Sequence, residues 1–296
     1  MANPKMRQTL HNGGMVVAPG AYDVPTARLM QYLGFENLYV GGSQTGTVLG
    51  TTEPLTTVTH MADVARTVVK ACRSDLPVIL DAGAGFGDPV HVMYAVEALE
   101  AAGVTAIHIE DQFYPKRVSY HQGKEHVVPI DVYQQRLEHA LKARRSEDFL
   151  IIGRNDGLRA VADSGNPEGG SKEEAVKRAH AALEVGVDAI MIIGVTEKEQ
   201  FRYFRDQIKD IPMVALANSS KVGIPDFEDT GHQIVIYPGA TIQASLAAVF
   251  DLYTHLLEKE MPPTNDGERA SLMREIPNVL TRMEEKWNVE EITTGA

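Results

Sequence analysis

The sequence predicts a (β/α)8 barrel, and three observations lead to this fold class. Short apolar runs typical of buried strands alternate with amphipathic helical stretches along most of the chain. There are eight such runs, and they are spread over roughly 250 residues, as in a typical (β/α)8 barrel. The helical stretches are long enough to serve as the crossovers that parallel strands require. A doubly wound open sheet has the same alternation, so periodicity alone leaves it open as the alternative.

The predicted strands are continuous apolar runs, as expected for parallel strands that are covered on both faces. They span Met15–Ala18, Leu38–Gly41, Val78–Asp81, Ala106–Glu110, Leu150–Arg154, Ala189–Ile193, Met213–Ala217 and Gln233–Tyr237. Helical periodicity is found between them at Pro25–Leu33, Val58–Ala71, Val90–Ala102, Ile130–Ala143, Lys172–Val185, Glu197–Ile208 and Ile242–Glu258. Two of the helices run into Gly103 and Gly186, which we expect to end them in a left-handed conformation.

The chain changes character after residue 260. Residues 261–296 open with Pro262-Pro263 and continue as a charged helical pattern from Glu268 to Trp287. Pro277 lies inside this pattern and is expected to break or kink the helix. We therefore predict a barrel domain over residues 1–260 and a C-terminal helical arm over residues 261–296. This arm is either a solvated closing segment or a contact with another subunit.

Composition narrows the class of partner. The chain has 296 residues, of which 44% are hydrophobic and 23% charged, and its formal net charge is −12. A negative charge of this size argues against nucleic acid or an anionic membrane as a partner. The single cysteine, Cys72, cannot form an internal disulfide, and no apolar run approaches the ~20 residues that span a bilayer. No signal peptide is visible in the polar first residues, so we expect a cytoplasmic protein.

Polar residues follow several predicted strands, at the end of a barrel where catalytic groups gather. Asp81 ends the third strand and is followed by a glycine-rich turn, while Glu110 and Arg154 end the fourth and fifth strands. After the second strand, Gly42 and Ser43 can present backbone N–H groups and a hydroxyl to an anion. An aspartate in this position can also cap the next helix, so a purely structural role for Asp81 remains open.

These residue types indicate a particular chemistry. Carboxylates gathered without thiol or imidazole neighbours suit a hard divalent ion such as Mg²⁺, or Mn²⁺ in its place. An arginine opposite them suits bidentate binding of a substrate carboxylate. The strand ends therefore predict a metal-dependent site for a small carboxylic acid, which is also the expected partner.

Five motifs resemble one known group of proteins, the isocitrate lyase and phosphoenolpyruvate mutase superfamily, and more narrowly its short methylisocitrate-lyase-like members. The similarity runs from about Pro19 to Glu258. The motifs are Pro19-Gly-Ala-Tyr-Asp23, Asp81-Ala-Gly-Ala-Gly-Phe-Gly87, Ile107-His-Ile-Glu-Asp-Gln112 with Pro115-Lys-Arg117, Gly153-Arg-Asn-Asp156 and Leu216-Ala-Asn218.

The resemblance implies a (β/α)8 barrel whose last helix is exchanged between subunits, in homodimers or homotetramers. It also implies Mg²⁺ and substrates that are 2-oxo or 2-hydroxy acids, with an enolate or oxyanion stabilised at the metal. It assigns Asp81 as the direct metal ligand, with Glu110 and Glu53 as further carboxylates of the metal site. It assigns Lys116 to the base of a mobile gating loop that excludes water. The residues that match substrate-pocket positions are Arg154, Tyr39, Gly42, Ser43, Asn218 and Ser220.

The chain departs from the family pattern at three positions. The usual Asp-x-Asp motif ends in Gly83, so one carboxylate is missing near the metal. Val118 stands where the carbon–carbon lyases have a cysteine, and it cannot transfer a proton. Ile193 stands where those lyases have a glutamate after the sixth strand. Tyr120 and His121 are the remaining candidates on the gating loop for a proton donor.

Three functions follow as hypotheses. The leading one is a Mg²⁺-dependent enzyme that cleaves a C–C bond in a small 2-oxo or 2-hydroxy dicarboxylic acid, by lyase or decarboxylase chemistry. The second is a mutase or hydrolase acting on the C–P bond of phosphonopyruvate. The third is a catalytically silent binder of small carboxylates, to which the three departures point. Retention of Asp81, Glu110, Lys116 and Arg154 argues against the third, because a decayed site has no physical reason to keep buried charges.

Overall fold

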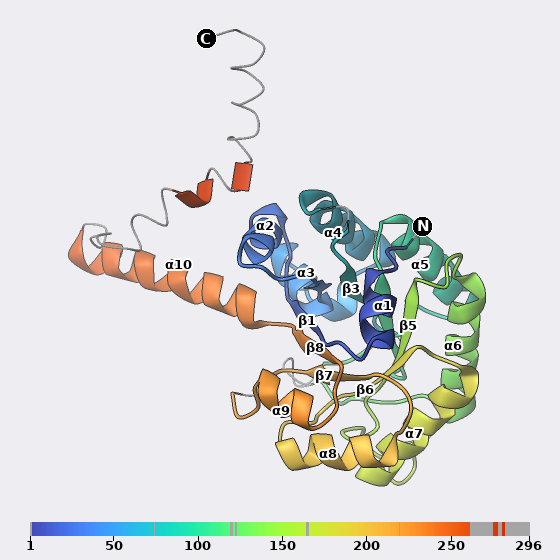
Figure 1. Cartoon of the computed structure of the whole chain (residues 1–296). Coiled ribbons are helices and arrows are strands. Elements are labelled where there is room, and N and C mark those ends of the chain that lie inside the picture. The colour runs from blue at the N-terminus through green and yellow to red at the C-terminus, as the bar shows by residue number, and fades with distance from the viewer. Residues whose placement is uncertain are drawn as a thin grey trace, which may run out of the picture.

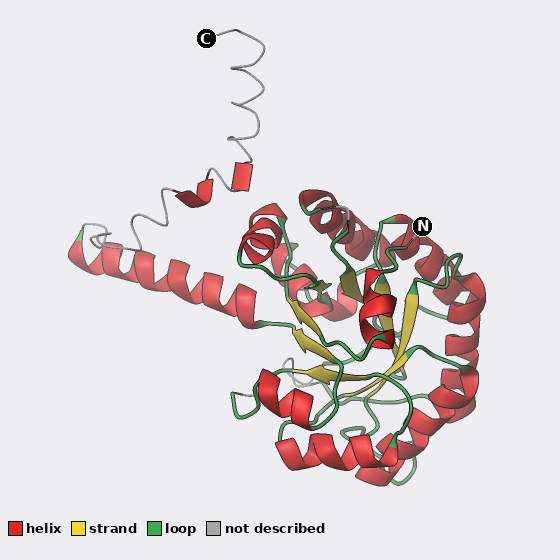
Figure 2. Cartoon of the chain, viewed as in Figure 1, coloured by secondary structure: helices red, strands yellow, loops and turns green. Residues whose placement is uncertain are grey.

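Eight apolar runs of the chain form eight parallel strands, and helices surround them (Figures 1 and 2). The computed structural model describes residues 2–73, 75–118, 121, 123–163, 166–218, 220–260, 275–277 and 280–281. The strands are β1 Val16–Pro19, β2 Leu38–Val40, β3 Val78–Asp81, β4 Ala106–Glu110, β5 Leu150–Asn155, β6 Ala189–Ile192, β7 Met213–Leu216 and β8 Ile234–Tyr237. Nearly all of the predicted arm, and Tyr120, lie outside the described residues.

The helices, in chain order, are α1 Lys5–His11, α2 Val24–Tyr32, α3 Gly42–Val48, α4 Val58–Ala71, α5 Pro89–Ala101, α6 Ile130–Ala143, α7 Lys172–Val185, α8 Lys198–Gln207, α9 Ile224–Asp229 and α10 Ala240–Lys259. A short 3₁₀ helix, Glu53–Leu55, follows α3. All seven predicted helices form, and their bounds differ from the predictions by at most two residues.

The sheet closes on itself. Its strand order is β1-β8-β7-β6-β5-β4-β3-β2, with every neighbouring pair parallel. The two outer strands of this order meet through a parallel bridge between Gly20 and Tyr39, where Ala21 N donates to Tyr39 O across 2.8 Å. The predicted (β/α)8 barrel is therefore confirmed over the open sheet. Gly103 and Gly186 have φ of 90° and 92°, the left-handed conformation expected after their helices.

The interior of the barrel is filled by apolar side chains from all eight strands. Two further residues, Met6 and Leu10, enter this core from α1, which lies across the barrel in Figure 1. Sequence analysis took this segment as a polar arm because only these two positions carry its apolar face. The strand residues of this core are Val16, Ala18, Tyr39, Ile79, Ala106, Leu150, Ile152, Ala189, Met191, Val214, Ile234 and Ile236.

The last helix, α10, differs from the others in its packing. It extends away from the barrel in Figure 1, and none of its residues is buried. Phe250 is 70% exposed and Leu257 84% exposed. A contact near its start, from Tyr22 Oη to Ser245 Oγ at 3.0 Å, ties it to the loop after β1.

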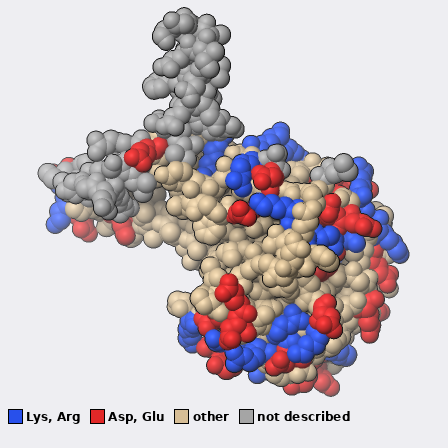
Figure 3. Space-filling model, in the orientation of Figure 1, with Lys and Arg blue, Asp and Glu red and all other residues tan. Residues whose placement is uncertain are grey.

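Acidic and basic side chains are interspersed on the face of the molecule in Figure 3. Part of this pattern is a set of ion pairs between α8 and α9, in which Lys198 binds Asp226 and Asp229 and Arg202 binds Asp229. Among the described residues, no helix is both long enough and apolar enough to cross a membrane.

Candidate active site

A pocket of about 360 Å³ lies where the strands end. Because β3, β4 and β5 are parallel neighbours, the polar residues at their carboxyl ends meet at one end of the barrel. Eight of the predicted site residues line it, namely Tyr39, Gly42, Ser43, Glu53, Asp81, Lys116, Arg154 and Asn218.

Strand register brings Glu110 and Arg154 together. The two residues are paired across β4 and β5, so their side chains leave the sheet on the same side. Arg154 Nη2 lies 2.9 Å from Glu110 Oε2, and Arg154 Nη1 lies 3.7 Å from Asp81 Oδ2. Glu110 is fully buried, and Arg154 is 9% exposed. A predicted pair of carboxylates and the predicted arginine thus form one cluster at the strand ends.

Lys116 joins this cluster from the loop after β4. Its Nζ lies 2.5 Å from Glu53 Oε1 and 2.9 Å from Glu110 Oε2. The short helix that begins at Glu53 carries the first of these carboxylates into the pocket. Burial works against the charged form of Lys116, but Glu110 and Glu53 raise its pKa above the ordinary value for a lysine. Lys116 is therefore held as an ammonium ion between two carboxylates.

Arg154 is oriented by Asp156, which is fully buried two residues further along the chain. Asp156 Oδ2 accepts from Arg154 Nε at 3.2 Å, and Oδ1 accepts from Nη2 at 3.3 Å. The backbone N–H of Asp156 donates to Asp111 Oδ1 at 2.9 Å, and Asp111 Oδ2 accepts from the buried Arg178 at 3.0 Å. This chain of buried contacts fixes the guanidinium of Arg154 toward the pocket.

His108 lies behind the cluster on β4. Its Nε2 is 3.0 Å from Tyr39 Oη, and its Nδ1 is 3.6 Å from Asp81 Oδ1. Burial lowers the pKa of His108 to about 4, despite the opposing effect of Asp81. The imidazole is therefore neutral at neutral pH, as expected for a buried histidine that is hydrogen-bonded to Tyr39.

The two strand-end carboxylates have different acidities. Burial raises the pKa of Glu110 to about 7, with Arg154 and Lys116 opposing the shift. Burial also disfavours the charge on Asp81, but Lys116, Arg154 and the N–H of Gly83 outweigh it and hold the pKa of Asp81 below its usual range. Asp81 is thus ionised at neutral pH, whereas Glu110 titrates close to neutral pH.

Asp81 does not cap the next helix. Its Oδ1 accepts from Gly83 N at 2.8 Å, within the glycine-rich turn. The helix that follows, α5, is capped by Asp88, which accepts from the N–H groups of Val90 and His91. The alternative role considered for Asp81, that of capping the next helix, is therefore wrong.

The donor set suits a divalent cation, although it is not preassembled. Within the described part of the chain, no three His, Cys, Asp or Glu side chains converge on one point as a metal centre requires. Lys116 Nζ lies between two of the three predicted ligands, Glu53 and Glu110. The buried Glu110 Oε1 has no hydrogen-bond partner among the described residues. A cation that replaced the Lys116 ammonium would find only carboxylate oxygens, which Mg²⁺ and Mn²⁺ prefer.

Gly83 leaves space beside this position. A Cβ added to Gly83 would have Lys116 Cδ, at 3.9 Å, as its nearest neighbour. This distance is an ordinary van der Waals contact, so the position of Lys116 does not by itself require a glycine here. The φ of 50° at Gly83 is in the left-handed region that favours glycine.

Four predicted site residues do not line the pocket or cannot be placed. Glu110 is fully buried and contacts the pocket residues Lys116 and Arg154. Tyr120 lies outside the described residues. His121 is exposed, and its Nε2 is 2.6 Å from Thr52 Oγ1, next to Glu53. Ser220 is exposed after β7 and does not line the pocket.

Residues 6–257 match the sequence profile of the family described as phosphoenolpyruvate phosphomutase. The chain belongs to this family. The predicted membership of the isocitrate lyase and phosphoenolpyruvate mutase superfamily is thereby confirmed.

Several relatives within the superfamily are lyases by name. The chain is 36% identical over 261 residues to 2-methylisocitrate lyase of Aeropyrum pernix, covering 86% of this chain and 79% of that one. It is 34% identical over 274 residues to 2,3-dimethylmalate lyase of Eubacterium barkeri, covering 91% and 88%. The structure of oxaloacetate acetylhydrolase with the inhibitor 3,3-difluorooxalacetate matches with a TM-score of 0.84 and 28% identity, covering 97% and 96%. The prediction of an enzyme of carbon–carbon lyase type is confirmed by these relatives.

Relative to the superfamily pattern, the pocket wall is apolar. Val118 and Ile193 both line the pocket, 6% and 4% exposed, at the places where lyases of the superfamily have a cysteine and a glutamate. Val195 and Leu216 extend the same wall. The described side chains of this wall therefore provide an apolar surface that can contact an aliphatic group, but they provide no proton donor.

Sequence reasoning missed two charged residues of the pocket, Glu125 and Arg159. Glu125 is brought in by the loop that follows β4, which folds back through an antiparallel bridge between Gln112 and Val127. Arg159 follows Arg154 in the loop after β5. Its proximity to the Gly153-Arg-Asn-Asp156 motif was the one available signal, whereas nothing local marks Glu125.

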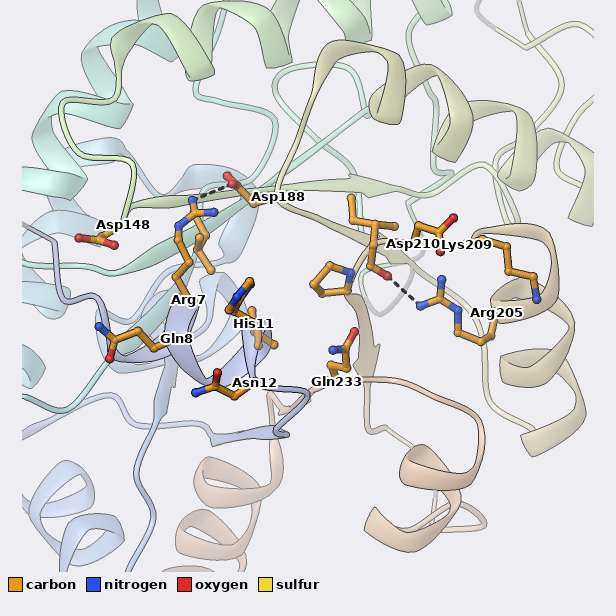
Figure 4. A pocket seen from close by; sticks show the side chains of 14 residues that line it. Arg7, Gln8, His11, Asn12, Asp148, Asp188, Arg205, Lys209, Asp210 and Gln233 are labelled. Carbon is orange, nitrogen blue, oxygen red and sulfur yellow. Dashed lines mark hydrogen bonds and ion pairs between the residues drawn. The ribbon is translucent and has the colours of Figure 1, made fainter.

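A larger hollow, of about 870 Å³, lies at the opposite end of the barrel, between α1 and the segments that lead into the strands (Figure 4). Its arginines are held by the fold. Arg7 binds Asp188 at 2.8 Å, and Arg205 Nη1 donates to Ile211 O at 2.8 Å. Because these cations are already paired, the hollow lacks the convergent buried groups found at the strand ends.

Proposed function

We propose that the enzyme cleaves a C–C bond in a small 2-oxo or 2-hydroxy dicarboxylic acid with the help of Mg²⁺. The observation that carries the proposal is the convergence of Arg154 and Lys116 on Asp81, Glu110 and Glu53 in one buried pocket. Buried charges cost free energy unless they serve binding or catalysis or are fully paired. Two long cations and three carboxylates at the pocket floor suit an anionic substrate and a cation together.

Arg154 binds the carboxylate next to the reacting carbon. Its guanidinium is planar and fixed by Asp156, so the edge that faces the pocket is preorganised for a carboxylate or an oxyanion. Lys116 places a second positive charge beside it. When the C–C bond breaks, its electron pair becomes an enolate, and the Arg154 guanidinium lowers the free energy of that anion. The enolate then takes a proton to give the product.

Asp81, Glu110 and Glu53 would hold the metal. The ion would supply positive charge to the substrate oxygens as negative charge develops on them. The three carboxylates are all within the cluster, and Asp81 is ionised at neutral pH. Lys116 would leave its place between Glu53 and Glu110, which its position on the loop after β4 allows.

The proton donor belongs to the gating loop. Val118 cannot supply a proton, so Tyr120 and His121 remain the candidates on this loop. His121 is exposed and is held by Thr52, so closure of the loop over a substrate would bring it nearer. A decarboxylase needs only the final protonation, whereas a lyase acting on a 2-hydroxy acid also needs a base for the hydroxyl proton. The apolar wall favours a substrate with an aliphatic branch.

The exposed side chains of α10 support a proposal for the oligomeric state. Its exposed apolar side chains, among them Phe250, Tyr253 and Leu257, are what a contact with a second copy would bury. We infer a homodimer or homotetramer in which this helix packs on a neighbouring barrel.

A turnover screen tests the proposed function. Oxaloacetate, methylisocitrate, 2,3-dimethylmalate and phosphonopyruvate would each be incubated with the enzyme and Mg²⁺, and the products identified by mass spectrometry. The proposal predicts cleavage of one of the first three acids. Release of phosphate from phosphonopyruvate alone would replace it with C–P chemistry, and no turnover together with no binding would leave a silent binder.

A further inference from the structure

The mouth of the pocket carries a second arginine that the proposed chemistry does not use. Arg159 lines the pocket in the loop after β5, and its side chain is 41% exposed, whereas that of Arg154 is 10% exposed. The two residues thus mark different depths of one cavity. Arg154 lies at the floor beside the carboxylates, and Arg159 lies at the entrance.

One carboxylate oxygen separates the two guanidinium groups. Asp156 Oδ1 lies 3.3 Å from Arg154 Nη2 and 3.8 Å from Arg159 Nη2. The two arginines are therefore close enough for the ends of a short dicarboxylate to reach one guanidinium each. Asp156 itself is fully buried and bound by Arg154 through two hydrogen bonds, so its charge is already balanced.

Arg159 is held in place from two sides. Glu125 Oε1, in a side chain that is 6% exposed, accepts from Arg159 Nη2 at 2.6 Å. The stem of Arg159 lies over Gly194, where an added Cβ would be 2.6 Å from Arg159 Cδ. A guanidinium has five N–H donors in a rigid fork, and Glu125 is bound through Nη2. The remaining donors are available to an anion that enters the pocket.

We propose, on the basis of the proposed function, that Arg159 is the specificity residue that binds the second carboxylate of the substrate. Arg154 takes the carboxylate next to the reacting carbon, and Arg159 takes the distal one at the mouth. The substrate class is thereby a short dicarboxylate, and an acid that lacks the distal carboxylate binds weakly. Glu125 competes with the substrate for Arg159 and holds its side chain in position when the pocket contains no acid.

Calorimetric binding of three stable probes in the presence of Mg²⁺ tests this inference. Oxalate reports on the Arg154 end, malate has a distal carboxylate, and lactate is a 2-hydroxy acid without one. The wild-type enzyme is expected to bind malate more tightly than lactate. Arg159→Gln is expected to weaken malate binding by about 10- to 100-fold, which is the contribution of one charge-assisted hydrogen bond. The affinities for oxalate and lactate should be the same in Arg159→Gln as in the wild type.

Further variants separate recognition from folding. Arg159→Lys, which keeps the positive charge, should restore part of the malate affinity that Arg159→Gln loses. Glu125→Gln should strengthen malate binding, because it removes the negative charge that competes with malate for Arg159. The control is Arg66→Gln, which alters an exposed arginine of α4 that pairs with Asp63.

The outcomes distinguish this inference from the proposed function. If oxalate and malate bind the wild type and Arg159→Gln weakens neither, or weakens both equally, the role of Arg159 is overturned while the site at Arg154 stands. Equal binding of malate and lactate by the wild type would also overturn it. If none of the three probes binds the wild type, the proposed function itself fails.

Discussion

Lys116 Nζ lies 2.5 Å from Glu53 Oε1 and links the loop after β4 to the short helix after α3, 63 residues earlier in the chain. The same nitrogen donates to Glu110 Oε2 at 2.9 Å. A single ammonium therefore contacts two of the carboxylates that we propose as metal ligands. Its position makes the charge state of the pocket floor depend on where this loop lies.

Substituting Lys116 tests that dependence. Lys116→Met removes the buried ammonium that binds both Glu53 and Glu110, which should lower the free energy of unfolding by about 3 kcal/mol in EDTA. Mg²⁺ should then stabilise the variant more than the wild type, because the ion no longer competes with the ammonium. Urea unfolding with and without Mg²⁺ measures both effects. Lys124→Met, an exposed lysine on the same loop, should change neither, and an equal Mg²⁺ response in Lys116→Met and wild type would contradict the prediction.

Burial raises the pKa of Glu110 to about 7, and this predicts a pH-dependent metal affinity. Only the ionised carboxylate binds a cation, so Mg²⁺ affinity should rise as the pH increases through about 7. Below pH 7 the affinity should fall by up to about tenfold per pH unit, since one proton must leave for each ion bound. Mg²⁺ titrations at pH 6, 7 and 8 check this. Glu110→Gln should bind Mg²⁺ more weakly than the wild type, and its affinity should not change with pH over this range. A wild-type Mg²⁺ affinity that does not change between pH 6 and pH 8 would contradict the prediction.

His232 predicts an acid sensitivity of the fold that is independent of the site. It is 2% exposed and packs edge-on against Phe201, and burial lowers its pKa to about 4. The unfolded chain takes up the proton near pH 6.5 and the folded chain only near pH 4, so stability is lost as the pH falls through this window. The loss reaches about 3 kcal/mol below pH 4.

The check is urea unfolding of wild type and His232→Gln at pH 7 and pH 4.5. The variant should lose less stability between the two values than the wild type. The exposed His180 on α7 provides the control, as His180→Gln should keep the full loss. Parallel losses in wild type and His232→Gln would show that other groups cause the acid sensitivity.

The exposed face of α10 predicts an assembly. Phe250→Asp combined with Leu257→Asp should shift the enzyme to a smaller species, because burying each side chain contributes about 1.5–3 kcal/mol. Light scattering after size-exclusion chromatography gives the mass, and circular dichroism should show that the barrel is retained. Glu258→Gln at the end of the same helix should leave the mass unchanged. A wild-type mass equal to one chain would refute the assembly.

The barrel itself was predictable because its signal is local. Each strand is an apolar run, and the long helices carry clear periodicity, so elements such as β3 and α4 were predicted with their observed bounds. Three short helices were not. The segment of α3, Gly42-Ser-Gln-Thr-Gly-Thr-Val48, contains glycines and threonines that favour other conformations, so tertiary packing decides its structure. Gly42 and Ser43 accordingly begin a helix where the sequence analysis predicted none.

The candidate site was predictable as far as it is built from strand ends. Asp81, Glu110 and Arg154 meet because parallel strands end together, which follows from the order of elements. Glu125 and Arg159 were not predicted, because loops bring them to the pocket and no local sequence pattern indicates which loop residues reach it. The contact of Lys116 with Glu53 came only as a shared match to the family pattern, without its geometry.

The central claim is that Asp81 and its neighbours form a Mg²⁺-dependent site for C–C cleavage. The most direct measurement is Mg²⁺ binding and turnover of the acid found in the screen, in wild type and Asp81→Ala, with and without EDTA. We predict that wild type binds Mg²⁺ and loses activity in EDTA, and that Asp81→Ala folds but neither binds the ion nor turns over the acid. Turnover that survives EDTA, or that survives in Asp81→Ala, would contradict the account.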